Sequence, residues 1–213
     1  MISQSKLTHM KGRAVAVLIV LIGAIAIGVM ASRTILDRSL DLRAASVFPT
    51  ARLLNPFELE KATGESFDAS DLQGQWTLLF FGFTNCPDIC PDTLASLSQS
   101  MASLRLMKAE NLPQVVFVSV DPDRDQGDGL NEYVTWFDSS FIGVSGSDEQ
   151  LEQLTQQLGV IYVRDTPDPQ TGFYNVDHSA AVMIIDPQGR LFGRFSHPLD
   201  PEMVTADLFQ ITS

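Results

Sequence analysis

Basic side chains are scarce in this chain. Its 213 residues include 14 lysines and arginines against 26 aspartates and glutamates, which gives a formal net charge of −12 at pH 7. All of the acidic residues lie beyond Ala31. Nucleic-acid binding needs clustered lysine and arginine to neutralise phosphates, so this composition excludes nucleic acid as a partner. A basic protein partner or a metal cation fits the charge, and so does an acidic surface that serves only solubility.

Cysteine is scarcer still, with two residues, Cys86 and Cys90. A disulfide between residues this close would constrain the unfolded chain by only about 2 kcal/mol on the loop-entropy model, against nearly 5 kcal/mol for a hundred-residue loop. Stability is therefore a weak reason for the pair, and a purely structural disulfide is the lesser alternative.

Internal repeats and low-complexity tracts are absent from the sequence, which excludes repeat architectures. Residues 32–52 are largely polar and contain Pro49, which indicates a stalk or linker. Beyond it, residues 53–213 are enough for one domain with a core and too few for two domains of ordinary size.

One long hydrophobic run is present, at residues 14–31, without a charged side chain. It is close to the length that spans a bilayer as a helix and exceeds an ordinary signal-peptide core. Residues 1–13 carry only basic charges, which predicts a cytoplasmic tail, a single transmembrane helix at 14–31 and an exported domain. That domain would lie on the periplasmic side of the inner membrane, or face the mitochondrial intermembrane space in a eukaryote. A signal peptide cleaved near Ala31 is the alternative, and it also exports the domain.

Hydrophobic periodicity beyond residue 53 predicts an α/β domain. Continuous apolar stretches at 76–83 and 115–120 are typical of strands buried on both faces of a sheet. A βαβ half followed by a ββα half predicts a thioredoxin-like mixed central sheet flanked by helices. The other expected elements are a weak hairpin within 57–67, helices at 91–112, 128–137, 148–158 and 201–211, a strand near 144, and strands at 161–164, 181–185 and 191–195.

The cysteines occur in the motif Cys86-Pro87-Asp88-Ile89-Cys90-Pro91, directly after the strand at 76–83. A sulfur at the following helix N-terminus is favoured as a thiolate by the helix dipole. Thiol–disulfide exchange and binding of a soft metal ion both need that thiolate. Redox pairs of the usual kind have two intervening residues, whereas three intervene here, which modestly favours metal.

Histidine offers a third ligand. His9 lies on the cytoplasmic side of the predicted membrane helix, and His197 lies in a loop where a surface role is expected. His178 precedes a strand expected to run antiparallel to the cysteine-bearing strand, so it should emerge at the same edge of the sheet. Its alternative role is a loop histidine satisfied by Asp177 or by the backbone. Two thiolates and one imidazole suit Cu(I), or Cu(II) with an added oxygen ligand, whereas structural zinc would lack a fourth protein ligand.

Three segments together resemble the Sco/SenC family, and the likeness extends from about residue 53 to the C-terminus. The segments are Phe81-Gly82-Phe83-Thr84-Asn85-Cys86-Pro87-Asp88-Ile89-Cys90-Pro91, Ser119-Val120-Asp121-Pro122-Asp123-Arg124-Asp125 and Val176-Asp177-His178-Ser179-Ala180. Their order and spacing are specific, although any one alone would not be.

The resemblance implies a thioredoxin-like fold, a membrane anchor, and copper ligation by Cys86, Cys90 and His178. It places Asp121 near the site, and Asp177 is a candidate partner of the histidine. Family members help to assemble the dinuclear copper (Cu-A) centre of cytochrome c oxidase, by copper delivery, by reduction of the target's cysteines, or by both. The implied partners are the Cu-A-bearing oxidase subunit, other copper chaperones and thioredoxin-like reductants.

Two alternatives stay open from the sequence. One is a membrane-anchored thiol–disulfide oxidoreductase in which Cys86 and Cys90 cycle and His178 only tunes them. The other is a peroxiredoxin-like peroxidase, which would need a single activated cysteine. A metallochaperone would not be an enzyme in the usual sense. The acidic tract at 121–128 is expected to be a solvated loop or a docking segment.

Overall fold

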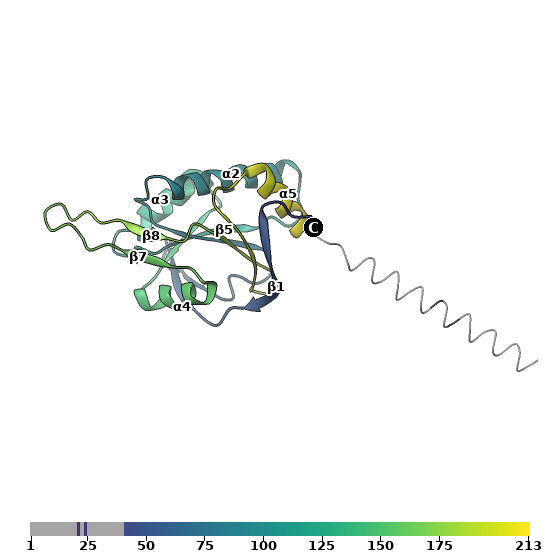
Figure 1. Cartoon of the computed structure of the whole chain (residues 1–213), viewed down its shortest axis with the longest axis horizontal. Coiled ribbons are helices and arrows are strands. Elements are labelled where there is room, and N and C mark those ends of the chain that lie inside the picture. Colours follow the sequence, from purple (N-terminus) through teal and green to yellow (C-terminus); the bar gives the residue numbers. More distant parts are fainter. Residues whose placement is uncertain (1–20, 22–23, 25–40) are drawn as a thin grey trace, which may run out of the picture. The chain divides into compact units, whose positions relative to one another are not determined.

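The computed structural model describes Leu21, Ala24 and residues 41–213 (Figure 1). The predicted tail at 1–13, almost all of the predicted membrane helix at 14–31 and the first part of the stalk lie outside the described residues. Within the part of the chain that is described, no helix combines the length and the apolar character needed to cross a membrane. Residues 41–213 form one α/β unit.

A mixed sheet of eight strands forms the centre of this unit, in the order β1-β10-β9-β4-β5-β6-β2-β3. Strands β4, β5 and β6 are parallel neighbours, and the other pairings in the sheet are antiparallel. The predicted thioredoxin-like mixed sheet is therefore confirmed. The strands are β1 (Ala45–Leu53), β2 (Glu58–Lys61), β3 (Ser66–Asp68), β4 (Thr77–Gly82), β5 (Gln114–Ser119), β6 (Ile142–Ser145), β9 (Val182–Ile185) and β10 (Arg190–Phe195).

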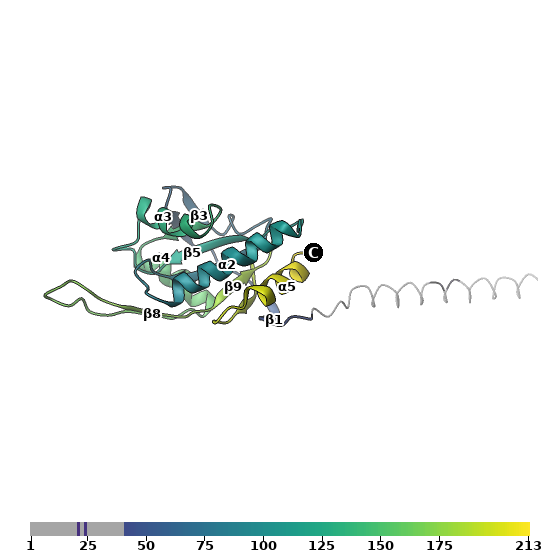
Figure 2. The same cartoon turned by 90° about the horizontal axis from the view of Figure 1, so that it is seen from above.

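Helices cover both faces of the sheet. Helices α2 (Ile89–Leu106), α3 (Gly127–Phe137) and α5 (Pro201–Ile211) lie on one face, and α4 (Asp148–Leu158) lies on the other (Figure 1). Seen from above, α2 and α5 lie side by side over the sheet (Figure 2). This arrangement makes two hydrophobic cores, one on each face.

Strand β4 is buried along its whole length. Leu79 and Phe81 belong to the core under α4, whereas Leu78 and Phe80 belong to the core under α2, as alternation along a strand requires. Such a strand reads as a continuous apolar run because it has no solvent-facing side. The sequence signal was strong here for that reason, and β4 delivers its C-terminal loop to the edge where the cysteines lie.

Part of the expected stalk is instead an edge strand. β1 pairs antiparallel with β10, with Ala45 opposite Phe195 and Leu53 opposite Arg190. The pairing shifts between Val47 and Arg52, a stretch that contains Pro49, and sheet edges and bulges are where proline is tolerated. Most of β1 is exposed, so the strand lacks the apolar alternation by which a sequence announces a strand.

A separate two-stranded sheet consists of β7 (Tyr162–Arg164) and β8 (Val176–His178). The hairpin that they form extends beyond the rest of residues 41–213 in both views (Figures 1 and 2). The sequence predicted β7 but placed His178 in a loop, because Val176 is the only apolar residue of β8 and the segment shows no apolar run. His178 is in fact paired with Tyr162 across the hairpin, so backbone pairing sets its position.

Candidate metal centre

The two cysteines lie where β4 passes into α2. Cys86 is in the connecting loop, and Cys90 is the second residue of α2. The backbone N–H of Cys90 donates to Cys86 Sγ at 3.4 Å, so a free amide of the helix N-terminus is directed at that sulfur. Such an amide stabilises negative charge on its acceptor. The predicted placement of the thiols at a helix N-terminus is therefore present in the structure.

The two thiols have different environments. Cys86 is partly exposed, whereas Cys90 is fully buried, and neither forms a disulfide. Burial raises the pKa of the Cys90 thiol far above its usual value, and the neighbouring Cys86 and Asp125 add to this effect. Burial thus favours the neutral form of the Cys90 thiol, and a bound metal cation would take the place of its proton. The two free thiols can bind a metal ion or be oxidised to a disulfide. Of the two sulfurs, Cys86 Sγ is the one that solvent and partner molecules can reach.

His178 comes from β8 to the same place. Its Nε2 lies 3.4 Å from Cys90 Sγ, and single ligand atoms of Cys86, Cys90 and His178 all lie within 4.8 Å of one another. The distant segments meet because β9, which follows His178, runs antiparallel to β4. This is the sheet-edge convergence expected from the sequence, and within the described residues it is the group of cysteine, histidine and carboxylate side chains close enough to hold a metal ion.

The His178 ring is held in a defined orientation. Its Nδ1 lies 3.2 Å from the carbonyl oxygen of Ser179, which can only accept, so Nδ1 carries the proton and Nε2 is left with its lone pair. The rings of Phe80 and Phe83 each meet the imidazole edge-on. The centroid of each phenyl ring lies 6.1 Å from the centroid of the imidazole. Burial lowers the pKa of His178, opposed by the Ser179 carbonyl and by Asp177. A neutral imidazole with a free Nε2 is the form that binds a metal.

The chemistry of the donor set fits copper. Two sulfurs and one imidazole nitrogen form a soft, low-coordinate group, which favours Cu(I). Zinc in a closed structural site normally has four protein ligands, and the group of close donors among residues 41–213 has three. These three side chains could therefore hold one copper ion and leave a position open for a ligand from another molecule.

Asp121 and Asp177 take different places around this site. Asp121 is fully buried and accepts from the Tyr174 hydroxyl at 2.6 Å and from the Arg124 guanidinium. The Arg124 guanidinium also stacks on Tyr174, 3.7 Å from its ring centroid, and lies over Phe83, the ring that packs against the histidine. Asp121 thus connects to the ligands through other side chains rather than by contact. Asp177 is exposed next to His178 and acts on it through charge.

Asp125 is a residue near the site that sequence reasoning missed. The acidic tract at 121–128 was expected to be a solvated loop or a docking segment. Asp123 and Asp128 are exposed, but Asp121 and Asp125 are both buried. Asp125 accepts from the backbone N–H of Thr84 at 2.7 Å and from the Ser119 hydroxyl at 2.6 Å. The available signal was the position of Asp125 and Thr84 after neighbouring parallel strands, whose C-terminal ends meet at one edge of a sheet.

The remaining candidates lie apart from the site. His197 is exposed, and its Nδ1 lies 3.5 Å from the hydroxyl oxygen of Thr93 on α2, consistent with the expected surface role. His9 lies outside the described residues.

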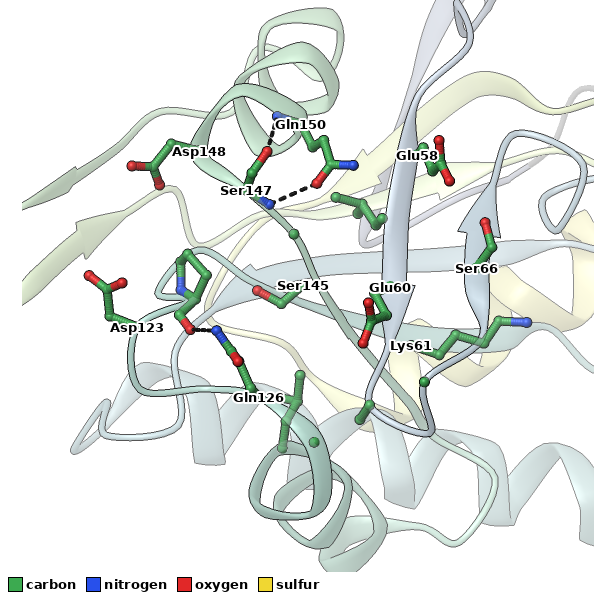
Figure 3. Close-up of a pocket in the computed structure, with 17 residues that line it drawn as sticks. Glu58, Glu60, Lys61, Ser66, Asp123, Gln126, Ser145, Ser147, Asp148 and Gln150 are labelled. Atoms are coloured by element: carbon green, nitrogen blue, oxygen red, sulfur yellow. Dashed lines mark hydrogen bonds between the residues drawn. The ribbon is translucent and has the colours of Figure 1, made fainter.

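A cavity of about 900 Å³ opens elsewhere, between the loops that follow β5 and β6. Figure 3 shows Glu60, Gln126 and Ser145 around it, and the hydrogen bonds between Ser147 and Gln150 that cap α4. None of the three metal-ligand candidates lines this cavity. The cavity is therefore separate from the group of Cys86, Cys90 and His178.

Comparison with known proteins places this geometry among relatives. Residues 47–213 match the family model described as SCO1/SenC. The chain is 38% identical over 140 residues to a SCO2-like protein of Rickettsia prowazekii, an alignment that covers 66% of this chain and 67% of that protein.

Two solved structures have the same fold. The solution structure of apo Sco1 from Thermus thermophilus has a TM-score of 0.70 and 36% identity, covering 78% of this chain and 95% of that one. The crystal structure of Arabidopsis thaliana ScoI with copper bound has a TM-score of 0.68 and 31% identity, covering 75% of this chain and 98% of that one.

Proposed function

This chain belongs to the SCO1/SenC family, and from that premise we propose that it binds copper through Cys86, Cys90 and His178 and helps to assemble the Cu-A centre of cytochrome c oxidase. The observation that carries the proposal is the convergence of two sulfurs and one imidazole nitrogen within 4.8 Å. Copper is the cargo here, and its protein partner is the oxidase subunit that carries the Cu-A centre.

The unequal exposure of the ligands supports a role in transfer. When Cu(I) binds, the protons of both thiols pass to solvent, and sulfur–copper bonds replace them. Cys86 and His178 are partly exposed, whereas Cys90 is buried. Ligands of a docked partner would therefore replace the two exposed donors first and Cys90 last, so that copper stays coordinated throughout. Other copper chaperones are the proposed source of the ion.

A second candidate function is favoured by the amide that donates to Cys86 Sγ. That hydrogen bond holds the partly exposed Cys86 sulfur at the helix N-terminus, from where its thiolate could attack a disulfide of the oxidase subunit or of another exported protein. A mixed disulfide would form, and Cys90 would then resolve it. The target leaves with two thiols, and the pair Cys86 and Cys90 leaves as a disulfide, which a thioredoxin-like reductant must restore.

Replacing His178 by alanine is expected to separate the two functions. Loss of one of the three donors should weaken Cu(I) binding by about 10- to 100-fold, the effect typical of damage around a metal site. Disulfide reduction by Cys86 and Cys90 should persist. Competition against a Cu(I) chelator measures the first, and oxidase activity in a deletion strain complemented with each variant measures the consequence.

His197→Ala is the matched control, because it removes an exposed histidine and should leave copper binding unchanged. Equal Cu(I) affinity of His178→Ala and the unaltered chain would show that the three-ligand site is wrong. Weak copper binding together with full oxidase assembly would instead favour the reductase.

We also propose that residues 14–31 anchor the domain in the inner membrane, with residues 53–213 on the periplasmic side or, in a mitochondrion, facing the intermembrane space. The uncharged run and its basic N-terminal flank support this. The full-length chain is expected in the membrane fraction after alkaline carbonate extraction, and a chain that begins at residue 32 is expected in the soluble fraction. Recovery of a soluble product that has lost residues 14–31 would favour the cleaved signal peptide.

A further inference from the structure

Asp125 is a buried carboxylate without a cationic partner. Its side chain is 1% exposed, and within residues 41–213 no lysine or arginine forms an ion pair with it. Three neutral donors satisfy it instead: the backbone N–H of Thr84 at 2.7 Å, the Thr84 hydroxyl at 2.5 Å and the Ser119 hydroxyl at 2.6 Å. Buried charged side chains are ordinarily paired with an opposite charge. A buried carboxylate without such a partner, near the candidate metal site, therefore indicates a functional role.

The hydrogen-bond directions show that the carboxylate is the acceptor. The N–H of Asp121 donates to Ser119 Oγ at 3.1 Å, which leaves the Ser119 proton free to point at Asp125. The Thr84 amide can only donate. Three donors thus converge on the two oxygens of the Asp125 side chain.

The network joins the loop that carries Cys86 to the loop after β5. Thr84 lies two residues before Cys86, and Asp125 lies beyond the end of β5, the parallel neighbour of β4. Two other acidic side chains near the site differ from Asp125. Asp121 forms an ion pair with Arg124, and Asp177 is exposed to solvent. Asp125 is therefore the buried acidic residue that lacks an ion-pair partner and is linked, through Thr84, to the loop that carries Cys86.

The charge of the site depends on the ion that it holds. Two thiolates with Cu(I) carry one net negative charge, whereas two thiolates with Cu(II) are neutral, and so is the metal-free dithiol. A fixed negative charge nearby disfavours the Cu(I) form relative to both of the others, and low-dielectric surroundings strengthen that effect. The same charge helps to raise the pKa of Cys90, although burial is the larger cause.

We propose that Asp125 is a positioning residue of the copper site, which holds the Cys86 loop through Thr84 and whose buried charge loosens Cu(I) relative to Cu(II). The inference rests on the proposed copper-binding function and concerns how that site is adjusted. Its consequence is a Cu(I) ion that can be released to a partner.

The test measures Cu(I) and Cu(II) affinities of the reduced full-length chain in detergent, for the unaltered protein and for Asp125→Asn. Removing the charge is expected to raise the ratio of Cu(I) to Cu(II) affinity by about tenfold, equivalent to a shift of about 59 mV to more positive potential for a one-electron couple. A structural role alone would weaken both affinities together and leave the ratio unchanged.

Two further variants accompany Asp125→Asn. One is expected to change the affinity ratio in the opposite direction, and the other is a control that should leave the ratio unchanged. Thr84→Val also removes a hydrogen bond to Asp125 but keeps the charge and leaves it less well satisfied, so the ratio is expected to fall. Asp123→Asn removes a carboxylate whose side chain is 81% exposed, and the ratio is expected to stay the same because solvent screens that charge.

An unchanged or lowered ratio in Asp125→Asn would overturn the inference while leaving the copper-binding proposal intact. Should Asp125→Asn fail to fold, Thr84→Val decides alone, and an unchanged or raised ratio there overturns the inference. If the unaltered chain binds neither ion, the proposed function and this inference both fall.

Discussion

Gly82→Ala is expected to weaken Cu(I) binding by about 10- to 100-fold, although the substitution adds only a methyl group to a strand. A Cβ built on Gly82 would lie 2.4 Å from Cys90 Sγ and 2.9 Å from the Phe117 ring. Both neighbours are fully buried, so neither can move into solvent. The sulfur that donates to the copper site occupies the space that an alanine side chain would need.

The substitution should also lower the free energy of unfolding by about 1 to 3 kcal/mol, the usual cost of overpacking a filled core. Urea denaturation measures this cost, and a Cu(I) chelator competition measures the affinity. Gly129→Ala, in α3, is the matched control, because a Cβ there meets no atom within 4 Å. Copper binding by Gly82→Ala that equals that of the control would contradict the assigned position of Cys90 Sγ.

Asp207→Ala is expected to destabilise the domain by about 3 to 4 kcal/mol, because hydrogen bonds to a charged group contribute about 1.5 to 3 kcal/mol each and do not add fully. Asp207 on α5 is fully buried. Its carboxylate accepts from the backbone N–H groups of Arg43, Ala44 and Ala45 at 2.7–3.1 Å. The substitution would leave these amides at the start of β1 without their acceptor.

Urea denaturation measures the loss, and hydrogen exchange of the amides at 43–45 shows whether β1 detaches first. Glu202→Ala is the control on the same helix, because Glu202 is exposed and its removal should cost much less. Equal stability of the two variants would show that β1 is not held through Asp207. Asp207→Asn, which keeps one acceptor oxygen, should fall between them.

The buried strands and the longer helices were predictable from sequence. β4 and β5 form unbroken apolar runs because both of their faces are covered, and α4 ends at Gly159, whose φ of 68° suits a residue without a Cβ. The predicted hairpin within 57–67 is present as β2 and β3. Each of these signals is local, which is why a single sequence contains it.

The metal centre was predictable in its composition and in its edge of the sheet. Cys86 and Cys90 are marked by their motif, and His178 by the antiparallel strand that follows it. The loop expected around His178 is a strand of the β7–β8 hairpin, and pairing with Tyr162 sets its position. That pairing involves residues sixteen apart and leaves no periodic pattern in so short a segment.

Sequence by itself determined the chemistry of this protein: two thiols at a helix N-terminus, an imidazole after them, and a mixed sheet to hold them. Tertiary structure alone decided that β1 belongs to the sheet and that Asp121 and Asp125 are buried. It also decided that Cys90 Sγ packs against Gly82, in the space that a Cβ at residue 82 would need. The physical reason is that hydrophobic periodicity reports what one segment needs to bury, whereas burial of a carboxylate or contact with a sulfur depends on partners brought together from distant segments.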